Sequence, residues 1–192
     1  MHQLNVKTIQ LFKHNPLSEI NMKNIITVIT FLFLFVHLNA ASKSEPIENI
    51  KNFSLLSPAL ASAGMPSDGE FTLVQQSGYK HIINLIPGDF SREKIKVNAL
   101  DMTFDQIEVD WNEPTLDDFK HFVRLMNTYK QEKVLVHCRL NYRASVFAYL
   151  YQTTQLGLDE TTAQSQMHAI WAPDGTWLNF INEVQKNYSN PQ

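Results

Sequence analysis

A chain of 192 residues, of which 44% are hydrophobic and 18% charged, has the composition of a folded globular protein with one domain of ordinary size. Its formal net charge of −3 and its lack of a lysine- or arginine-rich run argue against nucleic acid or an anionic membrane surface as a partner. The single cysteine, Cys138, cannot form an intramolecular disulfide, which favours a free thiol or an intermolecular bond.

The start of the chain has the pattern of an export signal. A mostly apolar run over residues 25–36 is preceded by a lysine and followed by small residues. This run has the length of a signal-peptide core and is shorter than the ~20 residues of a membrane span. We interpret residues 1–40 as a signal peptide, with Met22 as a possible start and an uncleaved anchor as the alternative, and residues 41–52 as a linker. The mature protein is then expected to be periplasmic or secreted, with no stable membrane association.

Predicted strands and helices alternate through the remaining chain. This alternation predicts one α/β domain over residues 53–190, with a mostly parallel central sheet of four to five strands and helices on both faces. In chain order we expect one or two short edge strands in 53–60, a turn over 61–67, a helix over 68–76, a strand over 81–86, a helix over 92–100, a strand over 103–109, a helix over 116–129, a strand over 134–136, a helix from 144 that Gly157 ends, a helix over 159–171 and a final helix from 176.

The helix over 116–129 has the clearest pattern. Thr115 precedes it, and Asp118 follows three residues later, which is a variant of the capping box. Asp117 and Asp118 also suit the positive end of the helix dipole, so we assign both to the helix start rather than to catalysis. The apolar residues recur at helical spacing and predict one buried face: Leu116, Phe119, Phe122, Val123, Met126 and Tyr129.

The strand predicted over 134–136 is followed by His137 and then by the only cysteine of the chain, Cys138. Cys138 is followed by Arg139 and Arg143, so two of the four arginines in the chain lie in this loop. Backbone N–H groups and the dipole at the start of the next helix would stabilise a thiolate or a bound oxyanion here. The thiolate is the nucleophilic form of cysteine, and a guanidinium group binds phosphate or sulfate through two hydrogen bonds. These residues predict an anion-binding loop around a nucleophilic cysteine.

A candidate acid follows the strand predicted over 103–109. Asp110 comes directly after this strand, and the carboxyl ends of parallel strands meet at one edge of a sheet. We therefore expect Asp110 to lie near Cys138, where a carboxylic acid can protonate a leaving oxygen. Asp105 is a nearby alternative, and Trp111 is a candidate for the mouth of the site.

These residues resemble the protein tyrosine phosphatase superfamily, in particular small dual-specificity-like enzymes and bacterial members of the beta-lactamase-hydrolase-like phosphatase type. The resemblance rests on the strand Ile82-Ile83-Asn84-Leu85, on Val109-Asp110-Trp111 followed by Pro114-Thr115, and on Val136-His137-Cys138 followed by Arg143. It implies that Cys138 is the nucleophile and forms a phosphocysteine, that Arg143 clamps the phosphate, and that Asp110 is the general acid. It further implies that His137 orients the loop and helps to hold the thiolate, and that no metal or other cofactor takes part.

The loop itself is expected to contact a phosphorylated protein or small molecule. The residues expected to bind this substrate are Arg139, Leu140, Asn141, Tyr142 and Ser145.

The loop departs from the superfamily pattern in its length. Four residues separate Cys138 from Arg143, whereas the superfamily has five, and the loop contains no glycine. Ser145 keeps the usual position of a hydroxyl residue, but Ala144 stands at the usual position of the arginine. The loop is similar in length to that of the rhodaneses, whose cysteine carries a persulfide. The sequence therefore predicts a cysteine-dependent phosphatase, with a rhodanese-like sulfurtransferase or persulfide-handling protein, and then an inactive anion-binding module, as alternatives.

Overall fold

The computed structural model describes residues 46–189. The predicted signal peptide, residues 1–40, lies outside the described residues. Between residues 46 and 189, no helix is both long enough and apolar enough to cross a bilayer. In chain order the elements are the 3-10 helix η2 (Ile47–Asn49), β1 (Ser54–Ser57), β2 (Leu60–Ala63), α2 (Glu70–Gln76), β3 (Tyr79–Asn84), α3 (Ser91–Asn98), β4 (Thr103–Gln106), α4 (Leu116–Thr128), β5 (Lys133–His137), α5 (Tyr142–Thr154), α6 (Glu160–His168) and α7 (Gly175–Ser189).

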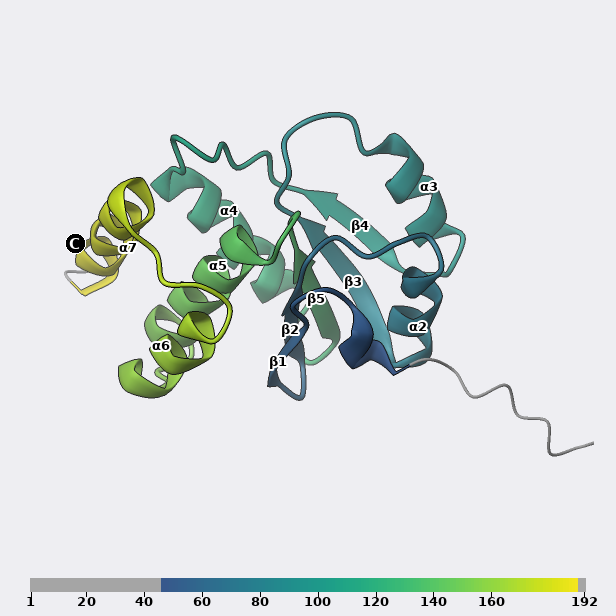
Figure 1. Ribbon diagram of the computed structural model, residues 1–192, viewed down its shortest axis with the longest axis horizontal. Helices are drawn as coiled ribbons and strands as arrows, with labels where there is room; N and C mark the ends of the chain where they lie inside the picture. The colour runs from purple at the N-terminus through teal and green to yellow at the C-terminus, as the bar shows by residue number, and fades with distance from the viewer. Residues whose placement is uncertain (1–45, 190–192) are drawn as a thin grey trace, which may run out of the picture. The chain divides into compact units, whose positions relative to one another are not determined.

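The sheet has five strands in the order β1-β2-β5-β3-β4. Strands β2, β5, β3 and β4 are parallel, and β1 is antiparallel to β2 at one edge. Figure 1 shows α2 and α3 on one side of the sheet and α4 to α7 on the other. The predicted fold class, a mostly parallel sheet with helices on both faces, is confirmed.

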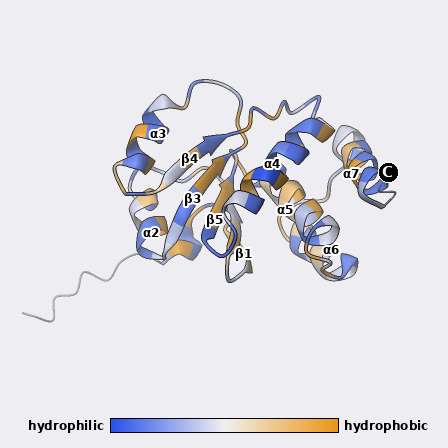
Figure 2. Cartoon of the chain, turned by 180° about the vertical axis from the view of Figure 1, so that it is seen from behind, coloured by the Kyte–Doolittle hydropathy of each residue, from blue (hydrophilic) through white to orange (hydrophobic). Residues whose placement is uncertain are grey.

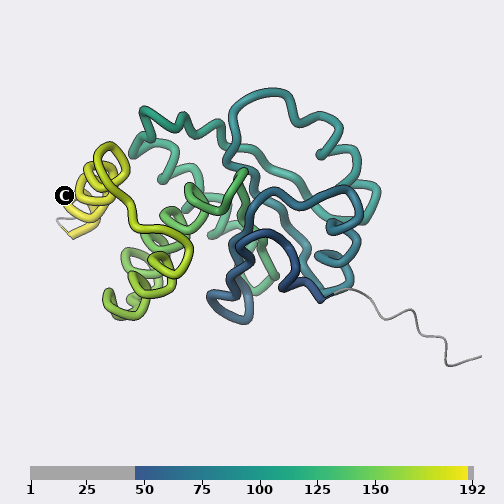
Figure 3. The backbone as a smooth tube through the Cα atoms, viewed as in Figure 1, coloured from purple at the N-terminus to yellow at the C-terminus, as the bar shows by residue number. Residues whose placement is uncertain are grey.

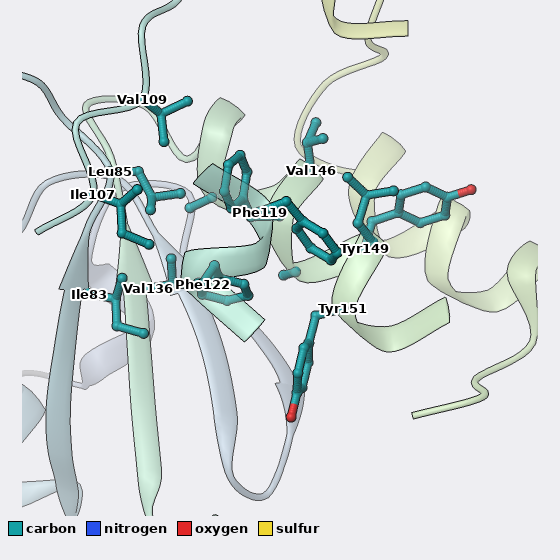
Figure 4. Packing of buried hydrophobic residues seen from close by; sticks show 14 of the residues in the cluster. Ile83, Leu85, Ile107, Val109, Phe119, Phe122, Val136, Val146, Tyr149 and Tyr151 are labelled. Atoms are coloured by element: carbon teal, nitrogen blue, oxygen red, sulfur yellow. The ribbon is translucent and has the colours of Figure 1, made fainter. Parts of the chain in front are cut away.

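Two apolar clusters, one on each face of the sheet, hold these layers together. Alternate residues along a strand point to opposite faces, so Ile82 packs under α2 and α3 whereas Ile83 packs under α4 and α5. Figure 4 shows the larger cluster, in which Phe119 and Phe122 of α4 meet α5. Every residue from Ala144 to Gln152 in α5 is buried, and Figure 2 shows the hydrophobic residues gathered along β5 and α5.

The prediction of a turn over 61–67 is wrong at its start, where residues 61–63 belong to β2. All four residues of β2 are buried between β1 and β5, and α5 packs against this strand. The sequence Leu-Ala-Ser-Ala has small side chains and little apolar alternation, which resembles a turn. A strand between two neighbours and under a helix nevertheless accepts small residues, because they allow close packing.

Two other strands end earlier than predicted. β3 ends at Asn84 and β4 at Gln106, instead of at residues 86 and 109. The N–H of Ile107 still donates to the carbonyl of Asn84, but Val109 N–H turns back to the carbonyl of Ile107. Among residues 46–189, β4 pairs with β3 alone, so the ladder of hydrogen bonds stops where β3 stops. The apolar alternation continues because Ile107 and Val109 enter the core from a loop.

The stretch predicted as a linker over 41–52 contains packed residues where the structure describes it. η2 occupies Ile47–Asn49, and Ile50 is 1% exposed within the cluster under α2. The described end of this stretch is therefore packed as part of the domain.

Candidate active site

The candidate residues follow one row of the sheet at the carboxyl ends of its parallel strands. His137, the last residue of β5, is paired with Ala63 of β2 on one side and Asn84 of β3 on the other. Asn84 is in turn paired with Gln106 of β4. The segments that follow these strands, including Cys138 after β5, therefore lie at the carboxyl end of the sheet. In open α/β sheets, ligands bind at this end.

Cys138 begins a tight loop between β5 and α5, whose path Figure 3 shows. Its side chain is 2% exposed, and its N–H donates to the carbonyl of Ala63. The loop turns into α5 at Asn141, which has a left-handed backbone with φ of 69°. Asparagine tolerates this conformation better than most residues, so it replaces the glycine that the loop lacks.

The side chain of Asn141 holds the loop through hydrogen bonds to two residues earlier in the chain. Its amide Nδ2 donates to the carbonyl of Asn52 at 2.6 Å and to Oγ of Ser62 at 3.0 Å. Although Asn141 is the N-cap of α5, it makes no side-chain capping hydrogen bond. The first N–H groups of a helix have no acceptor within the helix. The N–H groups at the start of α5 therefore have no acceptor from the Asn141 side chain, and the helix dipole would favour an anion there.

Gly64 holds the other side of the loop. It pairs with Leu140 in an isolated antiparallel bridge, and Met65 N–H donates to the carbonyl of Arg139. A Cβ atom at position 64 would lie 2.9 Å from the carbonyl oxygen of Lys51 and 3.2 Å from that of Arg139. Only glycine allows the backbone after β2 to approach the cysteine loop this closely.

Arg143 lies in the first turn of α5, five residues after Cys138. Its guanidinium carbon is 5.6 Å from the ring centre of Trp111, a cation–π contact. Its Nε atom is buried and has no hydrogen-bond partner among the residues that the structure describes. A buried donor without an acceptor is costly, and a bound oxyanion would provide the acceptor.

The loop that carries Asp110 reaches the site through Trp111. The Trp111 ring contacts Trp171 at 5.5 Å and Trp177 at 5.2 Å between ring centres, and its carbonyl accepts a hydrogen bond from Trp177 Nε1. Asp110 itself is exposed, and its carboxylate accepts a hydrogen bond from the N–H of Asn112 at 2.7 Å. The contact between Trp111 and Arg143 thus brings the Asp110 loop beside the first turn of α5.

His137 is completely buried behind Cys138. Its Nε2 atom is 2.8 Å from Oε1 of Glu93, a residue of α3, and its ring forms a T-shaped contact with Phe71. The sequence predicts a loop-orienting role for His137, and the structure gives it a fixed orientation through Glu93.

The residues predicted to bind substrate differ in what their side chains do. Arg139 is exposed, and Leu140 is half-buried beside Gly64. The ring of Tyr142 stacks on Trp171 at 4.9 Å between ring centres. Ser145 is buried, and its hydroxyl donates to the carbonyl of Tyr142, which is a hydrogen bond within the helix. The side chains of Asn141 and Ser145 are thus engaged by the protein itself.

Several residues that shape the site are absent from the sequence-based prediction. Gly64, Asn52 and Ser62 hold the loop, and Glu93 with Asn84 holds His137. The only sequence signal for the role of Gly64 is weak: it is a glycine within a predicted turn. Asn84 and Ser62 are single polar residues within apolar stretches, which is a weak signal of a buried polar contact, whereas no local pattern marks Asn52 or Glu93.

Solved structures of phosphatases share this fold. A protein from Shewanella putrefaciens CN-32, described as a "putative phosphatase (DUF442)", is 34% identical over 74% of this chain and 96% of its own, with a TM-score of 0.68. A variant of TpbA from P. aeruginosa, in complex with pTyr, is 15% identical over 79% of this chain and 99% of its own, with a TM-score of 0.60. The core catalytic domain of the PP-IP phosphatase SIW14 from S. cerevisiae is 16% identical over 76% and 93%, with a TM-score of 0.62.

The fold and these comparisons define the class of the protein: it has the α/β phosphatase-like fold that its sequence predicts. At 34% identity over nearly the whole of the Shewanella protein, the chain belongs to the DUF442 family of phosphatase-like proteins. No family model and no curated protein sequence matches it.

Proposed function

We propose that this protein hydrolyses phosphoesters through a covalent phosphocysteine on Cys138. The observation that carries the proposal is the loop between β5 and α5. There a buried cysteine meets a helix start without a side-chain cap, and Arg143 has a buried Nε that lacks a partner in the described chain. The helix start and Arg143 favour a bound oxyanion at this loop, and a helix N-terminus and a cation beside a cysteine favour its thiolate.

The reaction takes two displacements at phosphorus. The Cys138 thiolate attacks, the bond from phosphorus to the ester oxygen breaks, and Asp110 donates a proton to the leaving oxygen. Water then attacks the phosphocysteine and gives a proton back to the Asp110 carboxylate, the S–P bond breaks, and inorganic phosphate leaves with the thiolate and the acid restored. Arg143 and the N–H groups at the start of α5 stabilise the negative charge on the phosphoryl oxygens in both steps.

The proposed substrate is a phosphate monoester of a protein or a small molecule. A variant of TpbA holds pTyr, and SIW14 is a PP-IP phosphatase, so the fold accommodates both kinds of substrate. Trp111 is 39% exposed beside Arg143 and offers an aromatic surface to the organic part of the substrate. This surface favours aryl phosphates as the first substrates to test.

The test is hydrolysis of a small aryl phosphate by the purified protein. We expect phosphate release that vanadate inhibits and that Cys138→Ser abolishes. Because the chain has one cysteine, alkylation of the wild-type protein should abolish activity equally. Activity that survives in Cys138→Ser would contradict the mechanism.

The length of the loop favours a second candidate. Four residues between Cys138 and Arg143 match the rhodanese-like spacing, in which the cysteine carries a persulfide sulfur that is smaller than a phosphoryl group. A sulfurtransferase would convert thiosulfate and cyanide to thiocyanate and would leave one sulfur atom on Cys138. If thiosulfate leaves no sulfur on the protein, this candidate is rejected.

A further inference from the structure

A carboxylate is buried behind the cysteine loop without a role in the reaction just described. Glu93 lies on α3, where its neighbours Arg92 and Lys94 are exposed. The side chain of Glu93 is only 10% exposed. Burying a carboxylate is costly unless it is paired and hydrogen-bonded, so its partners show what it does.

Both partners of Glu93 lie on the central strands. Its Oε1 atom is 2.8 Å from Nε2 of His137 and accepts a hydrogen bond from Nδ2 of Asn84 at 3.1 Å. Asn84 and His137 are paired in the register of β3 and β5, so one carboxylate oxygen bridges two neighbouring strands.

The orientation of the Asn84 amide follows from its other hydrogen bond. Its Oδ1 accepts from the N–H of Ile86 at 2.7 Å. Because the amide oxygen is occupied by a backbone donor, the NH2 group is the part that faces Glu93. Glu93 is therefore the acceptor in this cluster, and Nε2 of His137 must carry a proton to complete it.

This arrangement encloses and orients His137, the residue that precedes Cys138. His137 is fully buried, its ring forms a T-shaped contact with Phe71, and its Nδ1 has no hydrogen-bond partner in the described part of the chain. Glu93 makes the one ion pair that His137 forms among residues 46–189. A carboxylate at this distance favours the cationic imidazole over the neutral one, and a cation next to a cysteine favours the thiolate.

We propose that Glu93 is the positioning residue of the active site: it holds His137 with a proton on Nε2, and its charge supports a cationic imidazole that favours the Cys138 thiolate. The inference rests on the proposed function only in assigning that thiolate to catalysis. Glu93 acts through His137 and does not touch the substrate. The other charged residues that we assign to the site are Arg139, Arg143 and Asp110, and all three are unchanged when Glu93 is replaced.

The experiment measures the rate at which iodoacetamide alkylates Cys138 as a function of pH, in the wild-type protein and in Glu93→Gln. With a single cysteine in the chain, the rate reports on Cys138 alone and requires no substrate turnover. We expect the midpoint of the pH profile to rise by about one pH unit or more in Glu93→Gln. We also expect kcat/KM at neutral pH to fall about tenfold, because fewer molecules hold the thiolate.

Two further variants make the result specific. Glu108→Gln removes the same charge from an exposed position and should leave the midpoint unchanged. Asn84→Ala keeps the Glu93 carboxylate but removes the donor that orients it, and should raise the midpoint by less than Glu93→Gln does. Thermal unfolding of each variant shows whether it is folded, and if Glu93→Gln fails to fold, Asn84→Ala decides the question.

Two results would overturn the proposal. If the midpoint of the alkylation profile is unchanged in a folded Glu93→Gln protein, Glu93 has a structural role only. A midpoint that moves to lower pH would show that the carboxylate destabilises the thiolate directly and that His137 is neutral. If the wild-type protein fails to hydrolyse phosphoesters, the proposed function fails, whereas the alkylation profile still tests the role of Glu93.

Discussion

Arg143 combines an electrostatic and a packing role in one side chain. Its guanidinium stacks on Trp111, while its buried Nε lacks a partner among the described residues. Lysine cannot replace this arrangement, because an ammonium group is a compact charge without the planar fork that matches an oxyanion. The structure therefore distinguishes Arg143 from Arg139, which is exposed in the same loop.

The first prediction concerns Arg143→Lys. We expect kcat/KM for an aryl phosphate to fall by about 100-fold or more, the loss typical for removal of one oxyanion-stabilising group. The matched control is Arg139→Lys, which should change kcat/KM only a few-fold because Arg139 is exposed. Steady-state kinetics measure both, and equal losses in the two variants would contradict the assignment of Arg143 as the clamp.

The residues of the site differ in how far the sequence could predict them. His137, Cys138 and Arg143 are close together in the chain, so their chemistry is visible as a motif. Glu93 contacts His137 across 44 positions and Asn141 contacts Asn52 across 89. Such contacts depend on how distant segments meet, and no periodicity or spacing encodes them. The candidate loop was therefore visible in the sequence, whereas the distant contacts that support it were not.

At the scale of elements, the support for the loop depends on β2 and the backbone that follows it. β2 pairs with β5 from Leu60 to Ala63, and Gly64 then touches the loop directly. The pairing partner of Leu60 is Val134, far away in the chain. This long-range pairing explains why a short run of small residues forms a buried strand that its local sequence does not indicate.

The second prediction is that Gly64→Ala destabilises the protein and impairs the loop. The added Cβ would lie within 3.2 Å of two backbone oxygens, which cannot move as a flexible side chain can. We expect a loss of roughly 1–3 kcal/mol in the free energy of unfolding, together with reduced activity. The control is Gly69→Ala, where a Cβ meets no atom within 4 Å, and which should change stability by less than about 1 kcal/mol. Denaturant unfolding compares the two, and a neutral Gly64→Ala would refute the close-approach argument.

A polar cluster around Tyr149 of α5 connects the helices α5, α6 and α7. Its hydroxyl donates to Glu160 of α6 at 3.0 Å and accepts from Gln185 of α7 at 2.9 Å. Burial, followed by the hydrogen bond to Glu160, raises the pKa of Tyr149 from 10.0 to about 12. The folded protein therefore holds the phenolic proton more tightly than the unfolded chain does.

The third prediction follows from this shift. The contribution of Tyr149 to stability is complete below pH 10, where the tyrosine is protonated in both states, and is lost as the pH rises from 10 to about 12. In Tyr149→Phe the fall of stability over this range should be shallower than in the wild-type protein. Gln185 still donates to Glu160 in the variant, so the carboxylate keeps a partner. Denaturant unfolding at several pH values measures the slopes, and identical slopes would contradict the shift.

At the scale of the whole molecule, the alternation of strands and helices could be predicted because periodicity and caps are local. The capping box of Thr115 and Asp118 forms as expected, and the apolar face of α4 is buried. The order of the strands could not be derived from periodicity, because it depends on pairings between segments far apart in the chain. The same limit explains why the predicted ends of β3 and β4 are misplaced by a few residues.

The start of the chain carries a fourth prediction. We propose that residues 1–40 direct export and are then removed, because the apolar run over 25–36 has the length of a signal-peptide core. The full-length chain expressed in a bacterial host should be found in the periplasm or the medium, with Ala41 as its first residue. Cell fractionation and N-terminal sequencing measure this, and a cytoplasmic product that keeps residues 1–40 would refute it.

The most direct test of the central claim is to trap the intermediate on Cys138. The protein is mixed with a small aryl phosphate, quenched with acid during turnover and analysed by mass spectrometry. The mechanism predicts a mass increase of one phosphoryl group on the peptide that contains Cys138, and no such increase in Cys138→Ser. Turnover without a phosphoryl adduct on Cys138 would contradict the mechanism. The mechanism would also be contradicted if the protein released no phosphate and thiosulfate left one sulfur atom on Cys138.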